Sequence, residues 1–230
     1  MTERKDMIRK LARFSVERAA QAVSDDDLAL INRWVPEGEP RATAEDVHVR
    51  EAMVCNDMVD HYSTRFTVEA LGQIVALMPG VNLMRNHSTW QAGDLPIGRF
   101  FSARLVTKDG ATFVAAKFYW ERGTREGDDM ERKFALGLWR EVSISWWMSS
   151  YTNSIDGAPM DESPYYAGQK LPDGQTVIGI MSGIEEVNEV SVVHLGGQKE
   201  TSIGPAREFA GRDVVLMTMA RRKAAMEPVD

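Results

Sequence analysis

Three polar side chains from separate short segments could together carry out acyl transfer by a hydroxyl group. His87 follows Arg85 and Asn86, Ser143 is the third residue of Glu-Val-Ser-Ile-Ser, and Glu189 opens Glu-Val-Ser-Val-Val. Such a reaction needs a nucleophile, a base and a group that orients the base, and a fold usually brings these from distant positions. We therefore consider Ser143, His87 and Glu189 as candidate nucleophile, base and orienting acid.

Two serines in the segment 141–149 compete for the role of nucleophile. Side chains in a strand alternate between faces, so Ser143 and Ser145 share one face while Val142 and Ile144 share the other. One pleat repeat of about 7 Å separates the two serines, and only one of them can meet an imidazole properly. The alternative for either serine is a strand hydroxyl that bonds a neighbouring group.

His87 is the base candidate because it follows the apolar run 81–84 and begins a polar loop, where a strand can hold a side chain that still reaches a cleft. An imidazole titrates near neutral pH and can take a serine proton and return it to a leaving amine. The alternative for His87 is a surface histidine at a strand end. The competing histidines are His48, His61 beside Asp60, and His194.

The orienting group is open between two residues of one predicted strand, Glu189 at its start and His194 at its end. Glu189 and Ser191 share a face, so the carboxylate could point toward the sheet surface that carries Ser143. An ionised carboxylate that accepts from the imidazole N–H would fix its tautomer and favour the imidazolium. Glu189 could otherwise be an exposed acid in an acidic stretch.

Other chemistries have less support in the sequence. Cys55 lies within a predicted strand and has no paired histidine, and the four histidines lack metal-ligand spacing. No glycine-rich phosphate loop is present, so we expect neither a metal nor a cofactor. Neither candidate serine lies in a Gly-x-Ser-x-Gly elbow, which disfavours an unrelated intracellular esterase. Gly196 and Gly197 could let backbone approach a substrate carbonyl or could form a turn.

The local sequence around the three candidates resembles the prohead maturation proteases of tailed bacteriophages, distant relatives of herpesvirus assemblin. His87 is followed by Pro-Ile-Gly-Arg at 96–99, Ser143 lies in Val-Ser-Ile, and Glu189 opens its segment, in that order within about 50–200. The resemblance implies that His87 and Ser143 are the base and nucleophile, and that Glu189 takes the place of the second histidine of assemblin.

The same resemblance implies a protease that cuts scaffold and the amino-terminal extension of the capsid protein, and often itself. It would act in the host cytoplasm, inside the assembling procapsid, and a homo-oligomer is possible. The chain departs from the family pattern at Ser145, where glycine is common, at Ser88, where an acid commonly follows the histidine, and at 194–197, where a Pro-Ala turn often follows. A catalytically inactive protease fold, retained for capsid assembly or scaffolding, is the alternative from another class.

Composition sets limits on the partners. The chain has 230 residues, 43% hydrophobic and 27% charged, as in an ordinary globular protein, and could form one large or two small domains. A formal charge of -7 and a pI near 5.2 disfavour a nucleic-acid partner. One cysteine excludes an intramolecular disulfide, which suits a reducing compartment. No stretch approaches the roughly 20 apolar residues of a membrane span, so we expect a soluble, intracellular protein.

Apolar residues spaced by three or four predict a helical amino-terminal extension over 1–40. One helix is expected over 6–23, and a second is opened by Ser24 as the N-cap and continues to Trp34. The linker 36–40 follows. The extension could pack on the main domain, dock to a scaffold or be clipped off.

Residues 41–204 are predicted to form a protease-like, β-rich domain. The expected strands begin at 47 and cover 99–107, 111–121, 141–149 and 176–193, the last broken near Gly183, and the expected helices cover 68–78 and a segment capped by Asp128 that carries Met130, Phe134 and Leu138. Strand groups interrupted by helices favour an α+β fold with a mainly antiparallel sheet or barrel and flanking helices. Turn formers over 150–175 predict a loop insertion, either solvated or substrate-gating. Residues 205–230 are predicted to form a short helix and a tail.

Overall fold

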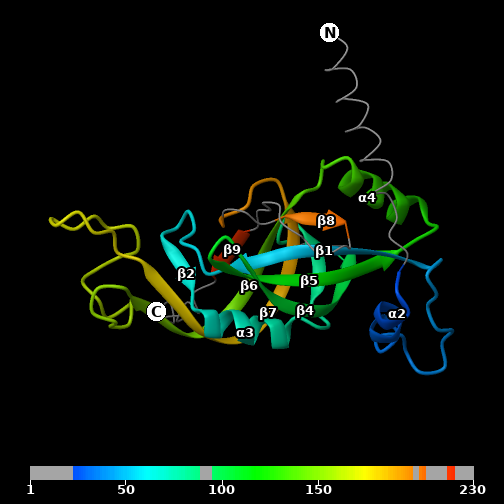
Figure 1. Cartoon of the computed structure of the whole chain (residues 1–230), viewed down its shortest axis with the longest axis horizontal. Helices are drawn as coiled ribbons and strands as arrows, with labels where there is room; N and C mark the ends of the chain where they lie inside the picture. Colours follow the sequence, from blue (N-terminus) through cyan, green and yellow to red (C-terminus); the bar gives the residue numbers. More distant parts are fainter. Residues whose placement is uncertain (1–22, 89–94, 199–201, 206–216, 221–230) are drawn as a thin grey trace, which may run out of the picture.

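The computed structural model describes residues 23–88, 95–198, 202–205 and 217–220. Within them one sheet of nine strands is accompanied by three helices (Figure 1), which confirms the predicted α+β class. The helices are α2 (Asp25–Ile31), α3 (Val68–Leu77) and α4 (Arg125–Ala135). The strands are β1 (Val47–Asn56), β2 (Thr64–Phe66), β3 (Asn82–Arg85), β4 (Gly98–Lys108), β5 (Ala111–Glu121), β6 (Glu141–Asn153), β7 (Gly179–Val193), β8 (Ile203–Pro205) and β9 (Met217–Ala220).

The sheet is mainly antiparallel and open. Its strand order is β8-β1-β5-β4-β3-β7-β6-β9, with β2 paired to β7 beside this path. The pairs β2/β7, β3/β7 and β6/β9 are parallel. Because the end strands β8 and β9 do not pair within the described residues, the sheet is not a closed barrel, and of the two predicted alternatives the structure has the open sheet.

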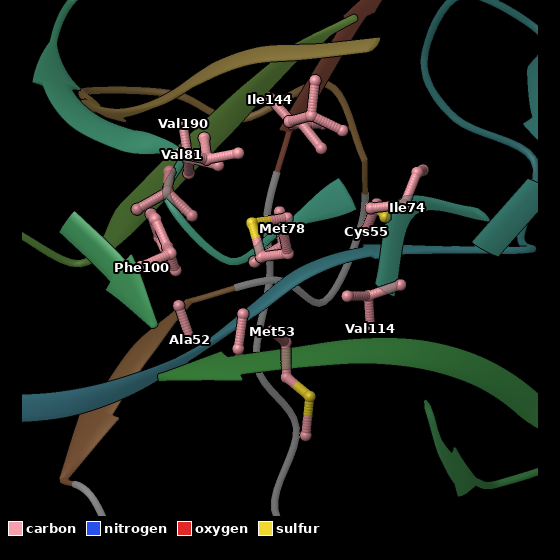
Figure 2. Packing of buried hydrophobic residues seen from close by; sticks show 14 of the residues in the cluster. Ala52, Met53, Cys55, Ile74, Met78, Val81, Phe100, Val114, Ile144 and Val190 are labelled. Carbon is pink, nitrogen blue, oxygen red and sulfur yellow. The ribbon is translucent and has the colours of Figure 1, made fainter. Parts of the chain in front are cut away.

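One face of the sheet carries the hydrophobic core. Val142, Ile144 and Trp146 of β6 are fully buried, and they alternate with the two serines as the pattern predicted. Figure 2 shows Ile74 of α3 and Met78 at its end among apolar side chains from several strands. Each such large apolar side chain stabilises the fold by about 1.5–3 kcal/mol on burial, so the core fixes which face of each strand points outward.

Local sequence accounts for several element ends. Asp109 and Gly110 take positive φ values of 50° and 81° in the hairpin between β4 and β5, as a two-residue turn of this kind requires. The hydroxyl of Thr67 accepts from the N–H of Ala70 and caps α3, and the Pro-Gly pair at 79–80 follows its end. The predicted hairpin and the predicted helix over 68–78 are therefore confirmed.

The predicted cap of α4 is wrong. Thr124, not Asp128, is the N-cap, because its hydroxyl accepts from the N–H of Gly127 at 3.1 Å. The helix ends at Ala135, so Leu138 lies beyond it and is 70% exposed. Met130 and Phe134 are buried on its inner face, as the spacing predicted.

The hairpin of β6 and β7 also differs from the prediction. Strand β7 is continuous through Gly183, whose φ of 64° accompanies an irregularity in the pairing with β6 instead of a break. The connecting loop covers 154–178 and projects at the end opposite α2 and α4 (Figure 1). Asn153 is buried and its amide bonds Asp156 and Ser163, which ties the base of this loop together.

Part of each predicted terminal segment lies outside the described residues. The predicted helix over 6–23 falls there almost entirely, while Ser24 caps α2 as predicted, with its hydroxyl accepting from the N–H of Asp27. That helix ends at Ile31, before Trp34. Within 205–230 the structure describes only residue 205, at the end of β8, and residues 217–220, which form strand β9, so the rest of the segment predicted to hold a short helix lies outside the described residues. None of the described helices is long and apolar enough to cross a membrane.

Helix α2 packs on the sheet. Asp27 accepts from the ammonium group of Lys117 on β5 at 2.9 Å, and Ile31 is fully buried in a small cluster with Val47 and Phe101. The described part of the amino-terminal extension therefore packs on the main domain, which is the first of the three roles considered for it.

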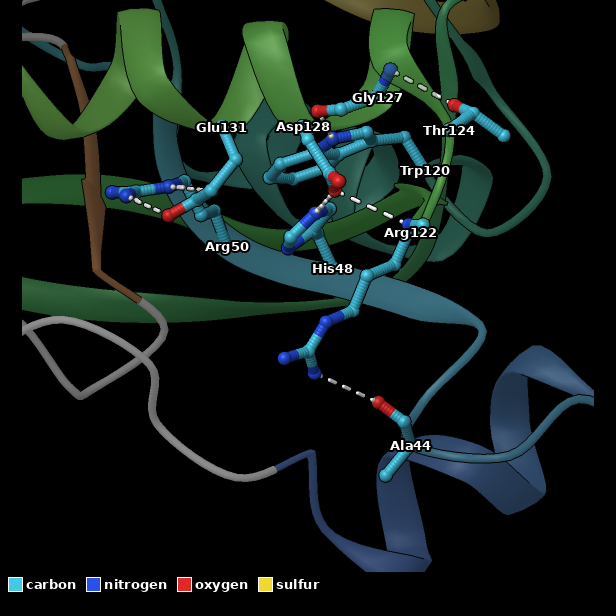
Figure 3. A network of polar contacts seen from close by, with 10 residues as sticks. Ala44, His48, Arg50, Trp120, Arg122, Thr124, Gly127, Asp128 and Glu131 are labelled. Atoms are coloured by element: carbon cyan, nitrogen blue, oxygen red, sulfur yellow. Dashed lines mark hydrogen bonds and ion pairs between the residues drawn. The ribbon is translucent and has the colours of Figure 1, made fainter.

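Helix α4 is held against the sheet by polar contacts to β1 and β5, drawn in Figure 3; the one to β5 is the hydrogen bond that the Trp120 Nε1–H donates to the carbonyl of Gly127 at 3.0 Å. The ring of His48 stacks on Trp120, with centroids 5.1 Å apart, and its Nε2 lies 2.9 Å from Asp128. This hydrogen bond lowers the pKa of Asp128 below its ordinary value. Arg50 meets Glu131 through both oxygens, so α4 has a fixed orientation on the sheet.

We predict opposite effects of the same substitution in two helices. A side-chain carbon at Gly127 of α4 would overlap the carbonyl oxygen of Glu121, whereas one at Gly72 of α3 would meet nothing within 4 Å. Gly127→Ala should therefore lower the free energy of unfolding by about 1–3 kcal/mol through overpacking. Gly72→Ala should raise it by about 0.5–1 kcal/mol through helix propensity. Urea denaturation of both variants measures this, and stabilisation by Gly127→Ala would contradict the packing described for α4.

Candidate active site

The turn after β3 positions His87. Strand β3 lies between β4 and β7, and the N–H of Ser88 donates to the carbonyl of Arg85 at 2.9 Å, which closes a four-residue turn. Its central residues, Asn86 and His87, both have left-handed φ values, 52° and 54°. Asparagine and histidine are among the residues that tolerate this region, at a cost of about 1–2 kcal/mol each.

Hydrogen bonds to β7 hold this turn in place. The N–H of Asn86 donates to the carbonyl of Val192, and the N–H of His87 donates to Oγ of Ser191, both at 2.9 Å. The left-handed backbone is therefore fixed by the neighbouring strand, and the imidazole is directed over the sheet instead of into solvent.

Strand register supplies the other side chains. In the antiparallel β6/β7 pair, Ser143 lies opposite Ser191 and Ser145 opposite Glu189. Paired residues point to the same face, and this face is opposite to the one that packs in the core. Ser143, Ser191 and Glu189 are therefore presented together beneath the imidazole.

The three predicted residues form one continuous chain of hydrogen bonds. Nδ1 of His87 lies 2.6 Å from Oε1 of Glu189, and Nε2 lies 2.5 Å from Oγ of Ser143. With Glu189 ionised, Nδ1–H donates to the carboxylate and Nε2 accepts from the serine hydroxyl. The structure thus brings together all three candidates, with His87 56 residues from Ser143 and 102 residues from Glu189 along the chain.

Burial sets the electrostatics of this chain. Ser143 has no exposed surface, Glu189 is 3% exposed, and the side chain of His87 is 18% exposed. A buried carboxylate is costly unless it is paired, so the imidazole and its other partners are needed to keep Glu189 in place. The buried hydroxyl also means that a substrate carbonyl must displace neighbouring groups before it reaches Ser143.

Ser191 is a site residue that the sequence did not single out. Its hydroxyl donates to Oε2 of Glu189 at 2.6 Å and accepts from the backbone N–H of His87. One fully buried side chain therefore fixes both the carboxylate and the turn that carries His87. Its position two residues after Glu189, on the same strand face, is the signal that could have found it.

The competing serine and the competing third member have other positions. Ser145 is 4% exposed and accepts from the side-chain amide of Asn188 at 3.2 Å, so its hydroxyl is used in a different contact. His194 lies in the bend after β7 and is exposed. The imidazole of His87 contacts Glu189, so geometry favours the carboxylate as the orienting group.

The remaining histidines do not approach the three candidates. His48 stacks on Trp120 and bonds Asp128 beneath α4. His61 is exposed, and the neighbouring Asp60 directs its carboxylate to Tyr62 and Thr64. In the described part of the chain, no group of three or more His, Cys, Asp or Glu side chains could hold a metal ion.

Two other sequence candidates are placed in structural roles. Cys55 is fully buried in the core, and burial raises the pKa of its thiol well above the ordinary value, which is unsuited to a nucleophile. The N–H of Gly196 donates to the Glu141 carboxylate at 2.5 Å, and the carbonyl of Gly197 accepts from the N–H of His61. The Gly-Gly pair therefore forms a bonded turn, which is one of the two roles considered for it.

Comparisons of the chain with protein-family models, curated proteins and solved structures found no match. The function must therefore be argued from the site itself.

We predict that Ser191→Ala destabilises the protein more than its small change in volume would suggest. The substitution leaves the buried Glu189 carboxylate and the His87 N–H each short of one partner, at a cost of about 1–3 kcal/mol. Ser149→Ala, which removes an exposed hydroxyl that donates to the Gly183 carbonyl, is the matched control and should change stability by less than about 0.5 kcal/mol. Denaturant unfolding of both variants measures the difference, and equal effects would show that the Ser191 contacts do not stabilise this site.

Proposed function

We propose that this protein is a serine hydrolase that cleaves peptide bonds, with Ser143 as nucleophile, His87 as general base and Glu189 as the orienting acid. The observation that carries the proposal is the unbroken chain from the Glu189 carboxylate through the imidazole to the Ser143 hydroxyl. Nucleophile, base and orienting group lie within the distances that proton transfer requires.

In this mechanism Oγ of Ser143 attacks the substrate carbonyl as its proton moves to Nε2 of His87. The resulting imidazolium donates Nδ1–H to the Glu189 carboxylate, so its positive charge is balanced by a negative charge in the buried site. The imidazolium then protonates the leaving amine as the C–N bond breaks. Water, deprotonated by the neutral imidazole, hydrolyses the acyl-serine and restores the hydroxyl.

We further propose that the substrates are the proteins of an assembling phage capsid. The resemblance to prohead maturation proteases rests on the segments that contain His87, Ser143 and Glu189, and these are the residues that meet in the fold. Scaffold, the capsid protein extension and the protease chain itself are then the expected substrates, inside the procapsid in the host cytoplasm, with a homo-oligomer possible.

One observation favours a second candidate, a protease fold that assists capsid assembly without catalysis. Ser143 has no exposed surface in the free chain, so no substrate carbonyl can reach it without rearrangement. A protein of this kind would keep the hydrogen-bonded trio for stability, and its assembly role would survive the loss of the hydroxyl.

We predict that Ser143→Ala and His87→Ala each lower peptide cleavage by at least about a thousand-fold, because each removes a group that makes or breaks a bond. The measurement is the intact mass of the protein and of co-expressed capsid and scaffold proteins. Ser145→Ala is the matched control and should keep cleavage, since its hydroxyl contacts Asn188 and not the imidazole. Processing by Ser143→Ala would contradict the assignment of Ser143 as the nucleophile. Absence of processing by the wild type would favour the non-catalytic candidate.

We also predict that Glu189→Gln slows cleavage by roughly 10²–10⁴-fold, because a neutral amide cannot pair with the imidazolium and no longer fixes the tautomer. His194→Ala should stay within about two-fold of the wild type, as expected of an exposed residue away from the ring. Initial rates on one cleaved protein substrate test the ranking. The reverse order would transfer the orienting role to His194.

A further inference from the structure

The groups that surround the Ser143 hydroxyl leave one direction in the sheet for a substrate. The sheet order β3-β7-β6 places His87, which follows β3, on the far side of β7, and its ring contacts both Glu189 of β7 and Ser143. Ser191 of β7 is paired with Ser143 on the same side. A hydroxyl that is bonded to its base on one side must meet the reacting carbonyl on another. The direction away from the base is the edge of β6 opposite β7, here called the outer edge of β6.

A cavity near the trio does not lie on this edge. It has a volume of about 610 Å³ and lies beside the turn that carries His87, between the ends of β3, β4 and β5 and the first turns of α4. Within the described part of the chain, none of the residues that line it belongs to β6 or β7. Strand β7 therefore separates the cavity from Ser143, and a group bound in the cavity approaches the trio from the side of the base.

The outer edge of β6 is occupied by strand β9, the short red strand in Figure 1. Ser143 is paired with Met217 and Ser145 with Met219, and the two strands run parallel. Neighbouring strands lie about 4.8 Å apart, so the backbone of β9 passes within one strand spacing of the candidate nucleophile. An extended segment of the chain itself thus lies where a substrate would have to approach.

Recognition at this edge uses the main chain. A strand edge presents N–H and C=O groups, and an added strand of any extended peptide can satisfy them. Strand β9 pairs in this way with residues 143–146 of β6. The other edge of β6 is taken by β7, so a further chain cannot pair there. The outer edge therefore fits a polypeptide segment in extended conformation that runs parallel to β6.

Strand β9 is held by less pairing than the strands that form the site. It has four residues, and within the described residues its other edge has no partner. Strand β7 pairs with β6 from Glu141 to Asn153 and also pairs with β3. Strand hydrogen bonds each contribute a similar small amount, and short end segments open before central strands. Strand β9 can therefore leave while the β3-β7-β6 arrangement, and with it the trio, is kept.

We infer that the outer edge of β6 is the substrate-binding edge of this protein, which takes the extended main chain of a polypeptide as an added parallel strand, and that β9 occupies it in the free chain. The inference rests on the proposed peptidase function and adds the surface and the conformation in which the substrate binds. Displacement of β9 opens the side of Ser143 away from the base, which is the rearrangement that a fully buried hydroxyl requires. An occupant that fills the edge about nine-tenths of the time lowers the apparent affinity of another peptide about ten-fold.

The test removes β9 from the edge through its backbone. Successive N–H groups of a strand point to opposite edges, so of two adjacent prolines at least one removes an N–H that faces β6. Thr218→Pro together with Met219→Pro is therefore the releasing pair. Thr218→Val together with Met219→Leu is the matched control, because it keeps both N–H groups and introduces no residue that disfavours a strand.

Binding is measured in full-length chains that carry Ser143→Ala, so that no peptide is cut. The probe is a fluorescein-labelled synthetic peptide with the sequence of residues 214–223, and fluorescence anisotropy gives its Kd. The releasing pair should bind the probe at least about ten-fold more tightly than the Ser143→Ala parent, and the control pair should stay within about two-fold of the parent. The same peptide with N-methylated amides at the Thr218 and Met219 positions should bind at least about ten-fold more weakly, because it lacks a main-chain donor.

Hydrogen exchange keeps the test valid if the releasing pair fails to fold. A tethered segment has an effective concentration of about 1 mM, so an isotope-labelled probe at that concentration should displace β9 measurably. Amide exchange within 217–220 of the parent chain should then rise at least about two-fold, while 143–146 stays protected. Equal binding of the probe by parent and releasing pair, equal binding of the N-methylated peptide, or exchange within 217–220 that the probe does not change would overturn the edge.

Cleavage separates this inference from the proposed function. In chains that retain Ser143, the releasing pair should raise the rate of cleavage of a tryptic digest of a bacterial proteome, read by mass spectrometry, at least about ten-fold, and the control pair should stay within about two-fold. Ser143-dependent cleavage that the releasing pair leaves unchanged or lowers would overturn the edge and leave the peptidase standing. Probe binding as expected, without Ser143-dependent cleavage by any of the chains, would overturn the peptidase and leave the edge as a peptide-binding site.

Discussion

The site depends on one interaction, the contact between Nδ1 of His87 and the buried carboxylate of Glu189. A carboxylate that is 3% exposed needs compensation for lost hydration, and the imidazole and the Ser191 hydroxyl provide it, one to each oxygen. The same contact fixes the ring tautomer that leaves Nε2 free to accept from Ser143. Stability and the proposed chemistry therefore depend on the same geometry.

The register of three strands makes that contact possible. A shift of one residue between β6 and β7 would turn Ser143 toward the core and expose Val142 or Ile144 to the outer face. Complete burial of both apolar residues makes such a shift costly, by several kcal/mol at about 1.5–3 kcal/mol for each side chain. The pairing irregularities lie beyond Ser145, so the segment that carries Ser143 is regular. Packing of the apolar side chains in the core therefore fixes the register of the strands. Because side chains alternate between faces, the same register also places the polar side chains of the site.

Much of this arrangement could be predicted from local pattern. Alternation placed Ser143 and Ser145 on the outer face, and the Asp-Gly turn and the Pro-Gly stop located a hairpin and a helix, because each depends on residues adjacent in the chain. Choosing between the two serines needed tertiary contacts, since only the fold shows that the Ser145 hydroxyl faces Asn188. Asp128 was predicted as the N-cap of α4 in place of Thr124 because an acidic residue also suits the first turn of a helix. The partner of the Asp128 carboxylate is His48 on β1, a contact that only the fold shows. For Ser191, the shared strand face with Glu189 could have indicated the bond to the carboxylate, but its bond to the backbone of His87, over a hundred positions away, depends on the fold.

The cavity and the hydrogen-bonded chain share one structural element, the turn after β3. Arg85 and Ser88 line the cavity, and the hydrogen bond between them closes the turn in which Asn86 and His87 take left-handed conformations. Any group that binds Arg85 therefore acts on the backbone that holds the imidazole, one residue beyond Asn86. Because Ser143 is fully buried in the free chain, a substrate of the proposed peptidase would need binding energy to expose the hydroxyl.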